Sequence, residues 1–282
     1  MYAYDVTLAQ RNIYFKTGIF LASCSLLLLV ALTGMLIPFL GESSGAALSR
    51  PNTLFQYLAG RFIHAAPFVP FLSIFSSAFY ALFVSIIVLV YFEKTQTPEI
   101  LFFGLFALSF VFETLRIMVP LRGLMDISSV SMIVGTRILV FARLFGTISL
   151  FAASVYSAGL DMQKQGRVVI GIIIAILLIS FRLPVNGFSW DTSFTMIFSY
   201  SAMIRSAESV LVVITGISFF IAAYSRGAAE YRYISLGSFL VFLGRSLLFS
   251  ADTWLSPIPA ITMLIIGTYL ITNRLHKVYL WL

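Results

Sequence analysis

The sequence predicts an all-α fold: a polytopic transmembrane helical bundle of about eight spans. Of its 282 residues, 60% are hydrophobic and 10% are charged, which is less than half the charged share usual in a soluble domain. Apolar runs recur along the whole chain, so we expect one integral membrane domain over residues 1–282. These runs do not alternate with polar residues, and they therefore favour membrane-spanning helices over a β-barrel.

Breaks at glycines, prolines and charged residues divide the chain into its expected spans. The first follows Arg11 and Lys16 and is too long for a cleaved signal peptide, so we interpret it as a retained signal-anchor helix. This divides the domain into residues 1–66, the signal anchor with an outer-leaflet segment, and residues 67–282, a seven-helix bundle. The expected spans lie near 17–40, 67–92, 99–120, 131–158, 168–184, 199–225, 233–250 and 258–274.

The outer-leaflet segment is expected from the spacing of four apolar residues. Leu54, Phe55, Leu58 and Phe62 recur at helical intervals and would share one face of a short helix lying on the membrane surface. A loop packed over the mouth of the bundle would explain the same residues.

The distribution of basic residues predicts the orientation of the bundle. Nine Lys and Arg residues lie before the first span or on alternate connections after it, against three on the opposite side. Both termini are therefore expected in the cytoplasm. The nine are Arg11, Lys16, Lys94, Lys164, Arg167, Arg226, Arg232, Arg274 and Lys277, and the three are Arg50, Arg61 and Arg122. Because this bias explains the net charge of +7, we expect no nucleic-acid partner.

Eight ionisable residues within the expected spans are the candidate binding residues. Each charge near the membrane centre costs roughly 2.5–3.5 kcal/mol on insertion scales, so these residues need partners, water or access to the interface. The predicted topology places most of them in the outer half of the membrane. They are Glu113, Arg116, Arg137, Arg143, Arg182, Arg205, Glu208 and Arg245.

Six arginines and two glutamates leave this layer with a formal surplus of four positive charges. Glu113 with Arg116, and Arg205 with Glu208, are separated by three residues and can form ion pairs on one helix or between helices. Arginine stays charged when buried and its planar fork suits carboxylates and phosphates, so the set favours an anionic ligand or lipid headgroup. Snorkelling of the arginines to headgroups, with two ion pairs holding the bundle together, is the alternative.

A weak internal repeat is visible in the sequence. The tetrapeptides at 133–136 and 265–268 read IVGT and IIGT, and Arg116 and Arg245 lie at a similar separation. A parallel duplication of four spans, as found in some transporters, would produce this pattern. Chance matches between apolar segments would produce it too.

The sequence predicts no cofactor, no metal site and no catalytic residues. His64 and His276 lie outside the expected spans, so they cannot form a bis-histidine haem site, and nucleotide-binding and protease motifs are absent. A non-enzymatic protein is favoured. One enzyme class stays open, a transferase of lipid phosphates that uses the arginines with Glu113 or Glu208.

The turn between the sixth and seventh spans carries a resemblance to a known family. Residues 225–233 read SRGAAEYRY, and residues 90–94 read VYFEK before an aromatic helix. These stretches resemble bacterial seven-transmembrane receptors with diverse intracellular signalling modules, in which a short basic turn joins two late helices on the cytoplasmic side. The resemblance covers about 67–274 and implies a signalling receptor. The region 41–66 is shorter than the family's extracytoplasmic sensor. Residues 1–282 hold no segment that we expect to form an effector domain, so under this resemblance a separate partner would carry the signal.

Three functions fit these observations. The first is a receptor-like protein or accessory subunit of the cell inner (cytoplasmic) membrane, which binds membrane lipids or an anionic small molecule through its arginines and contacts a cytoplasmic or membrane protein partner. The second is a transporter of an anionic or amphipathic substrate. The third is a structural or assembly subunit of a membrane complex, in which the arginines are ion-paired.

Overall fold

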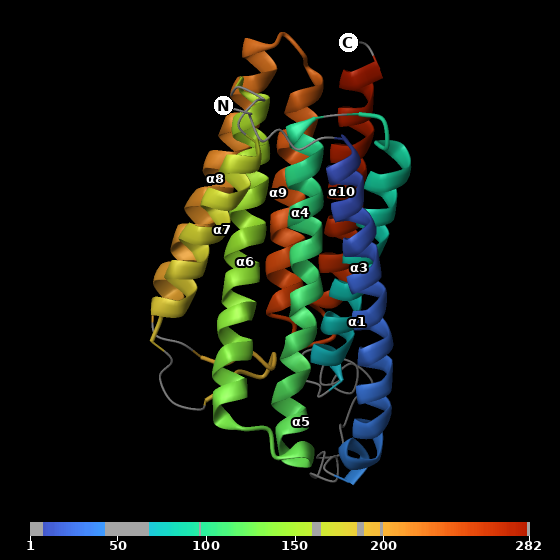
Figure 1. Cartoon of the computed structure of the whole chain (residues 1–282), viewed down its shortest axis with the longest axis vertical. Helices are drawn as coiled ribbons and strands as arrows, with labels where there is room; N and C mark the ends of the chain where they lie inside the picture. Colours follow the sequence, from blue (N-terminus) through green and yellow to red (C-terminus); the bar gives the residue numbers. More distant parts are fainter. Residues whose placement is uncertain are drawn as a thin grey trace, which may run out of the picture.

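The computed structural model is a bundle of helices (Figure 1). Among the residues it describes, the one β-type contact is an isolated bridge between Trp190 and Met196. Within the described part of the chain, eight helical segments are long and apolar enough to cross a membrane. This confirms the predicted fold class. The described residues are 8–42, 68–95, 97–159, 165–184, 189–197 and 200–280.

Each expected span overlaps one of these segments, and the third is built from α4, η1 and α5 in succession. The predicted surface helix with Leu54, Phe55, Leu58 and Phe62 lies outside the described residues. In chain order the helices are α1 (Leu8–Glu42), α3 (Val69–Tyr91), α4 (Pro98–Ser109), η1 (Phe110–Ile117), α5 (Met118–Met125), α6 (Ser129–Ser157), α7 (Gln165–Arg182), α8 (Ser201–Ser225), α9 (Glu230–Phe249) and α10 (Pro257–Leu280).

Helix α1 begins and helix α10 ends at the same end of the bundle (Figure 1). We call this the terminal end, and the opposite end, where α5 lies, the distal end. An even number of crossings brings the two chain ends to one side. The cytoplasmic location of the terminal end remains a prediction from the basic residues.

Helix α1 begins earlier than the expected span, at Leu8 rather than near residue 17. Arg11 therefore lies inside the helix, and it is buried. Its guanidinium donates hydrogen bonds to the carbonyls of Phe92, Glu93 and Thr95 in the connection between α3 and α4. The Phe92 carbonyl, at the C-cap of α3, also accepts from the N–H of Thr95 at 3.1 Å. Arg11 therefore fastens α1 to the backbone that follows the end of α3.

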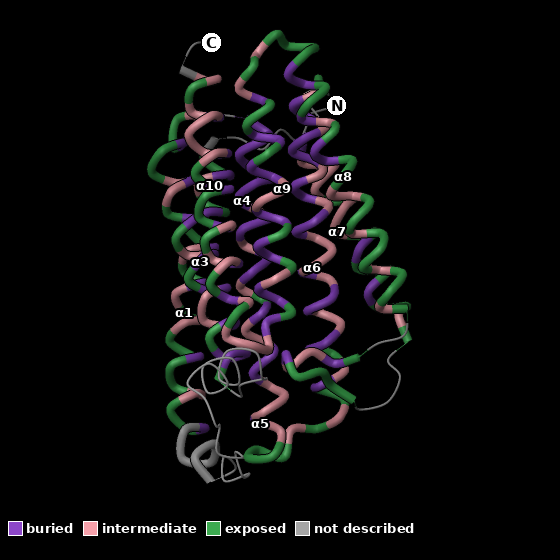
Figure 2. The backbone as a smooth tube through the Cα atoms, turned by 180° about the vertical axis from the view of Figure 1, so that it is seen from behind, coloured by how far each residue is buried: buried purple, intermediate pink, exposed green. Residues whose placement is uncertain are grey.

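The core lies between α3, α4, α6 and α9, each of which carries a row of buried residues (Figure 2). Aromatic rings fill it: Phe106 packs edge-on against Phe110 and Phe242, and Phe110 against Phe249. Helix α7 and the distal half of α8 are mainly exposed (Figure 2). Lipid tails are as apolar as leucine, so such faces suit contact with the bilayer.

The third span tightens in its middle. Residues Phe110–Ile117 form a 3₁₀-helix between the α-helices α4 and α5. In α-helical geometry the N–H of residue 120 would bond to the carbonyl of Arg116, but Pro120 has none, which favours a departure from α-helix in the preceding turn. The span continues past Pro120 to Met125, although we expected it to end there. A 3₁₀-helix eclipses side chains three residues apart, so it aligns Glu113 with Arg116.

Gly146 allows α6 to approach α4 closely at the edge of this region. A Cβ atom at this position would overlap the Ser109 hydroxyl and lie 3.7 Å from Nη1 of Arg245. We expect Gly146→Leu to lower the free energy of unfolding by about 1–3 kcal/mol through overpacking. Gly34→Leu is the matched control, since nothing lies within 4 Å of a Cβ there. Equal melting temperatures of the two variants in detergent would contradict the expected crowding.

Candidate functional site

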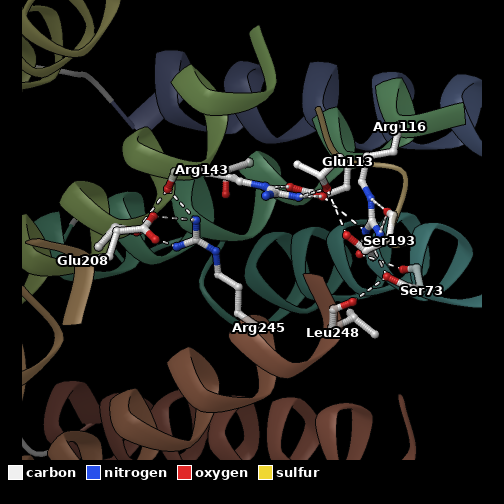
Figure 3. A network of polar contacts seen from close by, with 12 residues as sticks. Ser73, Glu113, Arg116, Arg143, Ser193, Glu208, Arg245 and Leu248 are labelled. Carbon is white, nitrogen blue, oxygen red and sulfur yellow. Dashed lines mark hydrogen bonds and ion pairs between the residues drawn. The ribbon is translucent and has the colours of Figure 1, made fainter. Parts of the chain in front are cut away.

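Five of the eight predicted binding residues meet in one group of polar contacts (Figure 3). We call this group the arginine network. Its members come from η1, α6, α8 and α9, so it joins the first half of the bundle to the second. Arg143 is the middle residue of the 29-residue helix α6, so the arginine network lies about halfway along the bundle. The five are Glu113, Arg116, Arg143, Glu208 and Arg245.

Glu113 is the central carboxylate of the arginine network. Its side chain is 1% exposed, and Arg143 holds both oxygens, with Nε 2.7 Å from Oε1 and Nη2 2.8 Å from Oε2. Arg116 approaches Oε2 from the other side, at 3.5 Å. The two-point contact with Arg143 is the strong fork geometry of arginine and carboxylate. Because both oxygens accept from guanidinium groups, Glu113 is not poised to act as a base.

Arg116 connects the network to the turn between α7 and α8. Its Nε donates a 2.9 Å hydrogen bond to the carbonyl of Ser193, and Nη2 donates to the same oxygen. The Nη1 group donates at 3.0 Å to the Ser73 hydroxyl, which in turn donates to the carbonyl of Leu248 at 2.5 Å. Arg116 therefore links η1 with α3, α9 and the distal turn (Figure 3).

The distal turn reaches Arg116 because it folds back on itself as a small hairpin. The N–H of Asp191 bonds to the carbonyl of Thr195 at 2.8 Å, and Phe194 packs edge-on against Phe71 of α3 at 5.2 Å between ring centroids. Phe194 has a positive φ of 58°, in the left-handed region that reverses the chain. These contacts bury Ser193 and present its carbonyl to Arg116.

Arg245 and Glu208 form the other edge of the network, and their contacts are looser. Arg245 Nη1 donates to the Thr147 hydroxyl at 2.6 Å, and Nη2 donates to the carbonyl of Arg143. Glu208 lies 3.8 Å from Arg245 Nη2. The Thr147 hydroxyl is 3.3 Å from Glu208 and 3.0 Å from the Arg143 carbonyl, so its single proton serves one of them at a time.

Aromatic faces surround the two central arginines. The Arg143 guanidinium lies 4.9 Å from the centre of the Phe249 ring and that of Arg245 lies 5.1 Å from it. Arg245 also lies 5.8 Å from the Phe106 ring. Such cation–π contacts stabilise a cation in a low-dielectric environment. They offset part of the free-energy cost of burying the network, whose three arginines and two glutamates leave a formal charge of +1.

The other three predicted binding residues lie apart from the network. Arg137 packs over the Phe181 ring at 5.6 Å, and its buried Nε has no hydrogen-bond partner among the described residues. Arg182 and Arg205 are exposed, at the last turn of α7 and the second turn of α8. Arg205 and Glu208 do not pair with each other on α8, and Glu208 instead forms an ion pair between helices, with Arg245.

Sequence reasoning missed the neutral partners of the network. Ser73, Thr147 and the carbonyl of Ser193 satisfy arginine donors, yet isolated hydroxyl residues in apolar spans are common and gave no signal. A signal existed for Ser193, because the polar turn around Asp191 interrupts two apolar spans at the end predicted to hold the charges. A backbone carbonyl, however, has no sequence signature.

A second buried ion pair lies at the terminal end and was also missed. Glu99, in the first turn of α4, is buried, and its Oε1 lies 3.6 Å from Nη1 of Arg226. Arg226 also donates to the carbonyl of Tyr156 at 3.0 Å and to the Tyr231 hydroxyl at 3.2 Å. The turn after α8 is thereby tied to α4 and α6. Glu99 was expected at a helix boundary rather than inside the bundle.

The fold and the arginine network define the class of this protein as a multi-pass helical membrane protein with an intramembrane ion-pair network. Within the described ranges, no group of three or more His, Cys, Asp or Glu side chains is placed to hold a metal ion. Comparison with protein-family models, curated proteins and solved structures gives no match to this chain.

Proposed function

We propose that this chain is a non-enzymatic, receptor-like protein or accessory subunit that binds an anionic group at the Arg143 and Arg245 edge of the arginine network. The observation that carries the proposal is the loose attachment of Glu208, compared with the tight clamp on Glu113. Glu113 is held at 2.7 and 2.8 Å, whereas Glu208 lies 3.8 Å from its arginine. Glu208 would then act as an internal anion that an external one displaces.

The exposed fractions of the side chains support the Arg143 and Arg245 edge of the network as the place where an anion would enter. The Arg143 and Glu208 side chains are 20% and 28% exposed, whereas Glu113 and Arg116 are closed off. All buried residues of α8 lie from Thr215 onwards, so the part of the helix that carries Glu208 is lightly packed. Figures 1 and 2 both show this part of α8 inclined away from α6. Displacing Glu208 therefore requires little loss of packing.

The bound group would meet two guanidinium groups beside an aromatic face. The Nε and Nη2 groups of Arg143 stay on Glu113, so the Nη1 group of Arg143 and the guanidinium of Arg245 would donate to the carboxylate or phosphate. Burial strengthens each of these contacts. The surplus charge of the network favours an anion once Glu208 has moved away. Binding would shift α8 relative to α6, and the turn at Arg226 would carry that shift to a cytoplasmic or membrane partner.

Location and kinship belong to the same proposal. The excess of basic residues at the terminal end supports a cell inner membrane protein with cytoplasmic termini. The resemblance to bacterial seven-transmembrane receptors supports a signalling role, in which Arg226 and its turn would face the partner. The buried contact of that turn with Glu99 is consistent with a part that transmits movement.

Thermal stabilisation of the purified protein in a zwitterionic detergent tests the proposal. The probes are phosphate, sulfate and citrate, with phosphatidylglycerol as the headgroup probe, each compared with potassium chloride at equal ionic strength. We expect at least one probe to raise the melting temperature. Arg245→Gln should abolish the rise, because it removes one of the two guanidinium groups. Glu208→Gln should lower the probe concentration needed by about tenfold, a gain of about 1.4 kcal/mol.

Arg205→Gln is the matched control on the same helix, since Arg205 lies outside the network. It should respond to the probes as the unaltered protein does. If no probe exceeds potassium chloride, or if Glu208→Gln binds more weakly, anion binding at this edge is wrong.

One observation favours a structural or assembly subunit as the second candidate. The cavity that borders the network beside Arg116 has a volume of about 20 Å³, enough for a single water molecule rather than a ligand. Network contacts that serve only stability would leave the melting temperature unaffected by anions. A partner that co-purifies in fixed stoichiometry would then support this function. Flux into proteoliposomes would support the transporter.

A further inference from the structure

We propose that a groove at the terminal end, between α1, α4, α6 and α7, binds one phospholipid with an anionic headgroup. Arg167 would contact the phosphate and the groove would hold an acyl chain. This site is separate from the arginine network and does not rest on the function proposed above.

The groove is large enough for such a ligand. Its volume is about 410 Å³, within the range of about 300–1,000 Å³ typical of small-molecule sites. Apolar side chains from four helices line it, including Leu101, Leu105, Phe145 and Ile173. The apolar lining therefore favours a hydrocarbon chain over water as the content of the groove.

The polar and apolar parts of the groove are ordered along the membrane normal. Arg167 and Gln10 lie in the first turns of α7 and α1, at the terminal end. Phe145 lies twelve residues before the end of α6, which is a depth of about 18 Å. The hydrocarbon of a bilayer is about 30 Å thick, so the groove spans roughly one leaflet. A lipid of that leaflet fits it with the headgroup at the helix ends.

Charge selects an anionic headgroup. Arg167 is the single charged residue among those that line the groove, and it makes no hydrogen bond or ion pair within the described part of the chain. A guanidinium at the membrane interface attracts anionic lipids and binds phosphate with paired hydrogen bonds. Tyr14, with a ring suited to the headgroup region, lines the opposite wall on α1.

The groove cannot close by a simple approach of α1 to α4. These helices are already in contact beside it, where the Phe15 ring covers Gly104 so closely that a Cβ atom on the glycine would overlap the ring. Phe15 is fully buried and fixed in the aromatic core. The contact between Phe15 and Gly104 therefore keeps α1 from moving closer to α4, and it sets the minimum width of the groove.

Native mass spectrometry of the purified protein tests the proposal. The protein is reconstituted in equal amounts of phosphatidylglycerol and phosphatidylcholine of the same chains, extracted into mild detergent and weighed with its retained lipids. We expect one phosphatidylglycerol per chain to persist. Arg167→Gln should reduce the preference for phosphatidylglycerol about tenfold, the effect of one lost charge-assisted contact. Ile173→Trp should displace both lipids by filling the groove.

Two control variants isolate these effects. Ile174→Trp adds the same bulk one residue away, where the side chain is 54% exposed and does not line the groove. Lys277→Gln removes a charge at the terminal end of α10. Both should retain phosphatidylglycerol as the unaltered protein does. Equal retention by Ile173→Trp, no preference for phosphatidylglycerol, or a fatty-acid mass in its place would overturn the assignment.

Discussion

Replacing Glu113 by Gln is expected to remove about 3–5 kcal/mol from the free energy of unfolding, the usual cost of breaking a buried ion pair. The substitution keeps the shape of the side chain but leaves Arg116 and Arg143 without the carboxylate between them. Arg116 is fully buried, so its uncompensated charge cannot be solvated. The loss comes mainly from this stranded charge rather than from the missing attraction.

Glu230→Gln is the matched control. Glu230 pairs with Arg274 at 2.7 Å, the same distance as the Glu113 contact, but both side chains are partly exposed. Such a pair contributes about 0–1 kcal/mol. Unfolding of both variants in mixed micelles with increasing dodecyl sulfate measures the difference. If Glu113→Gln unfolds at the same detergent fraction as Glu230→Gln, the network contributes no more than a surface ion pair.

The double variant Glu113→Gln with Arg143→Gln separates charge from shape. Removing one arginine together with the glutamate leaves fewer stranded charges, so we expect the double variant to be more stable than Glu113→Gln alone. Additive losses would indicate that the two residues do not interact, in contradiction to their two-point contact.

The sequence predicted the spans well because crossing a membrane imposes one strong constraint, a long apolar helix. All eight segments were found where hydropathy placed them. The largest error in boundary, at the start of α1, arose because Arg11 was assigned to the connection before the helix. In the structure three backbone carbonyls from a distant connection surround that arginine, and hydropathy cannot detect such a partner.

The arginine network was predictable in its members but not in its pairing. The three-residue spacing correctly joined Glu113 to Arg116, since both lie on one helical segment. For Arg205 and Glu208 the spacing left open a pair on one helix or a pair between helices, and the structure has the second, between Glu208 and Arg245. The sequence does not say which face of α8 turns towards α9. Arg245 contacts residues that lie 98 and 102 positions earlier in the chain. Such contacts depend on how the helices pack, which cannot be predicted from the spacing of residues along one helix.

At the terminal end, Arg226→Gln is expected to cost about 2–4 kcal/mol. Glu99 would lose its ion-pair partner in a buried position, a loss that approaches the full cost of breaking a buried pair. The Arg226 side chain is 28% exposed, so some of its charge is already screened and the loss should fall below that for Glu113. Arg232→Gln, on an exposed residue stacked over Tyr224, is the control and should cost less than about 1 kcal/mol.

A second substitution identifies the cause of the loss. If the stranded carboxylate is responsible, adding Glu99→Gln to Arg226→Gln should recover most of the lost stability, since a neutral amide needs no counter-charge. If the lost hydrogen bonds to Tyr156 and Tyr231 are responsible, the double variant stays as unstable as Arg226→Gln. Unfolding in mixed micelles gives both values. Recovery would show that Glu99 and Arg226 are coupled through their charges across the contact between α4 and the turn after α8.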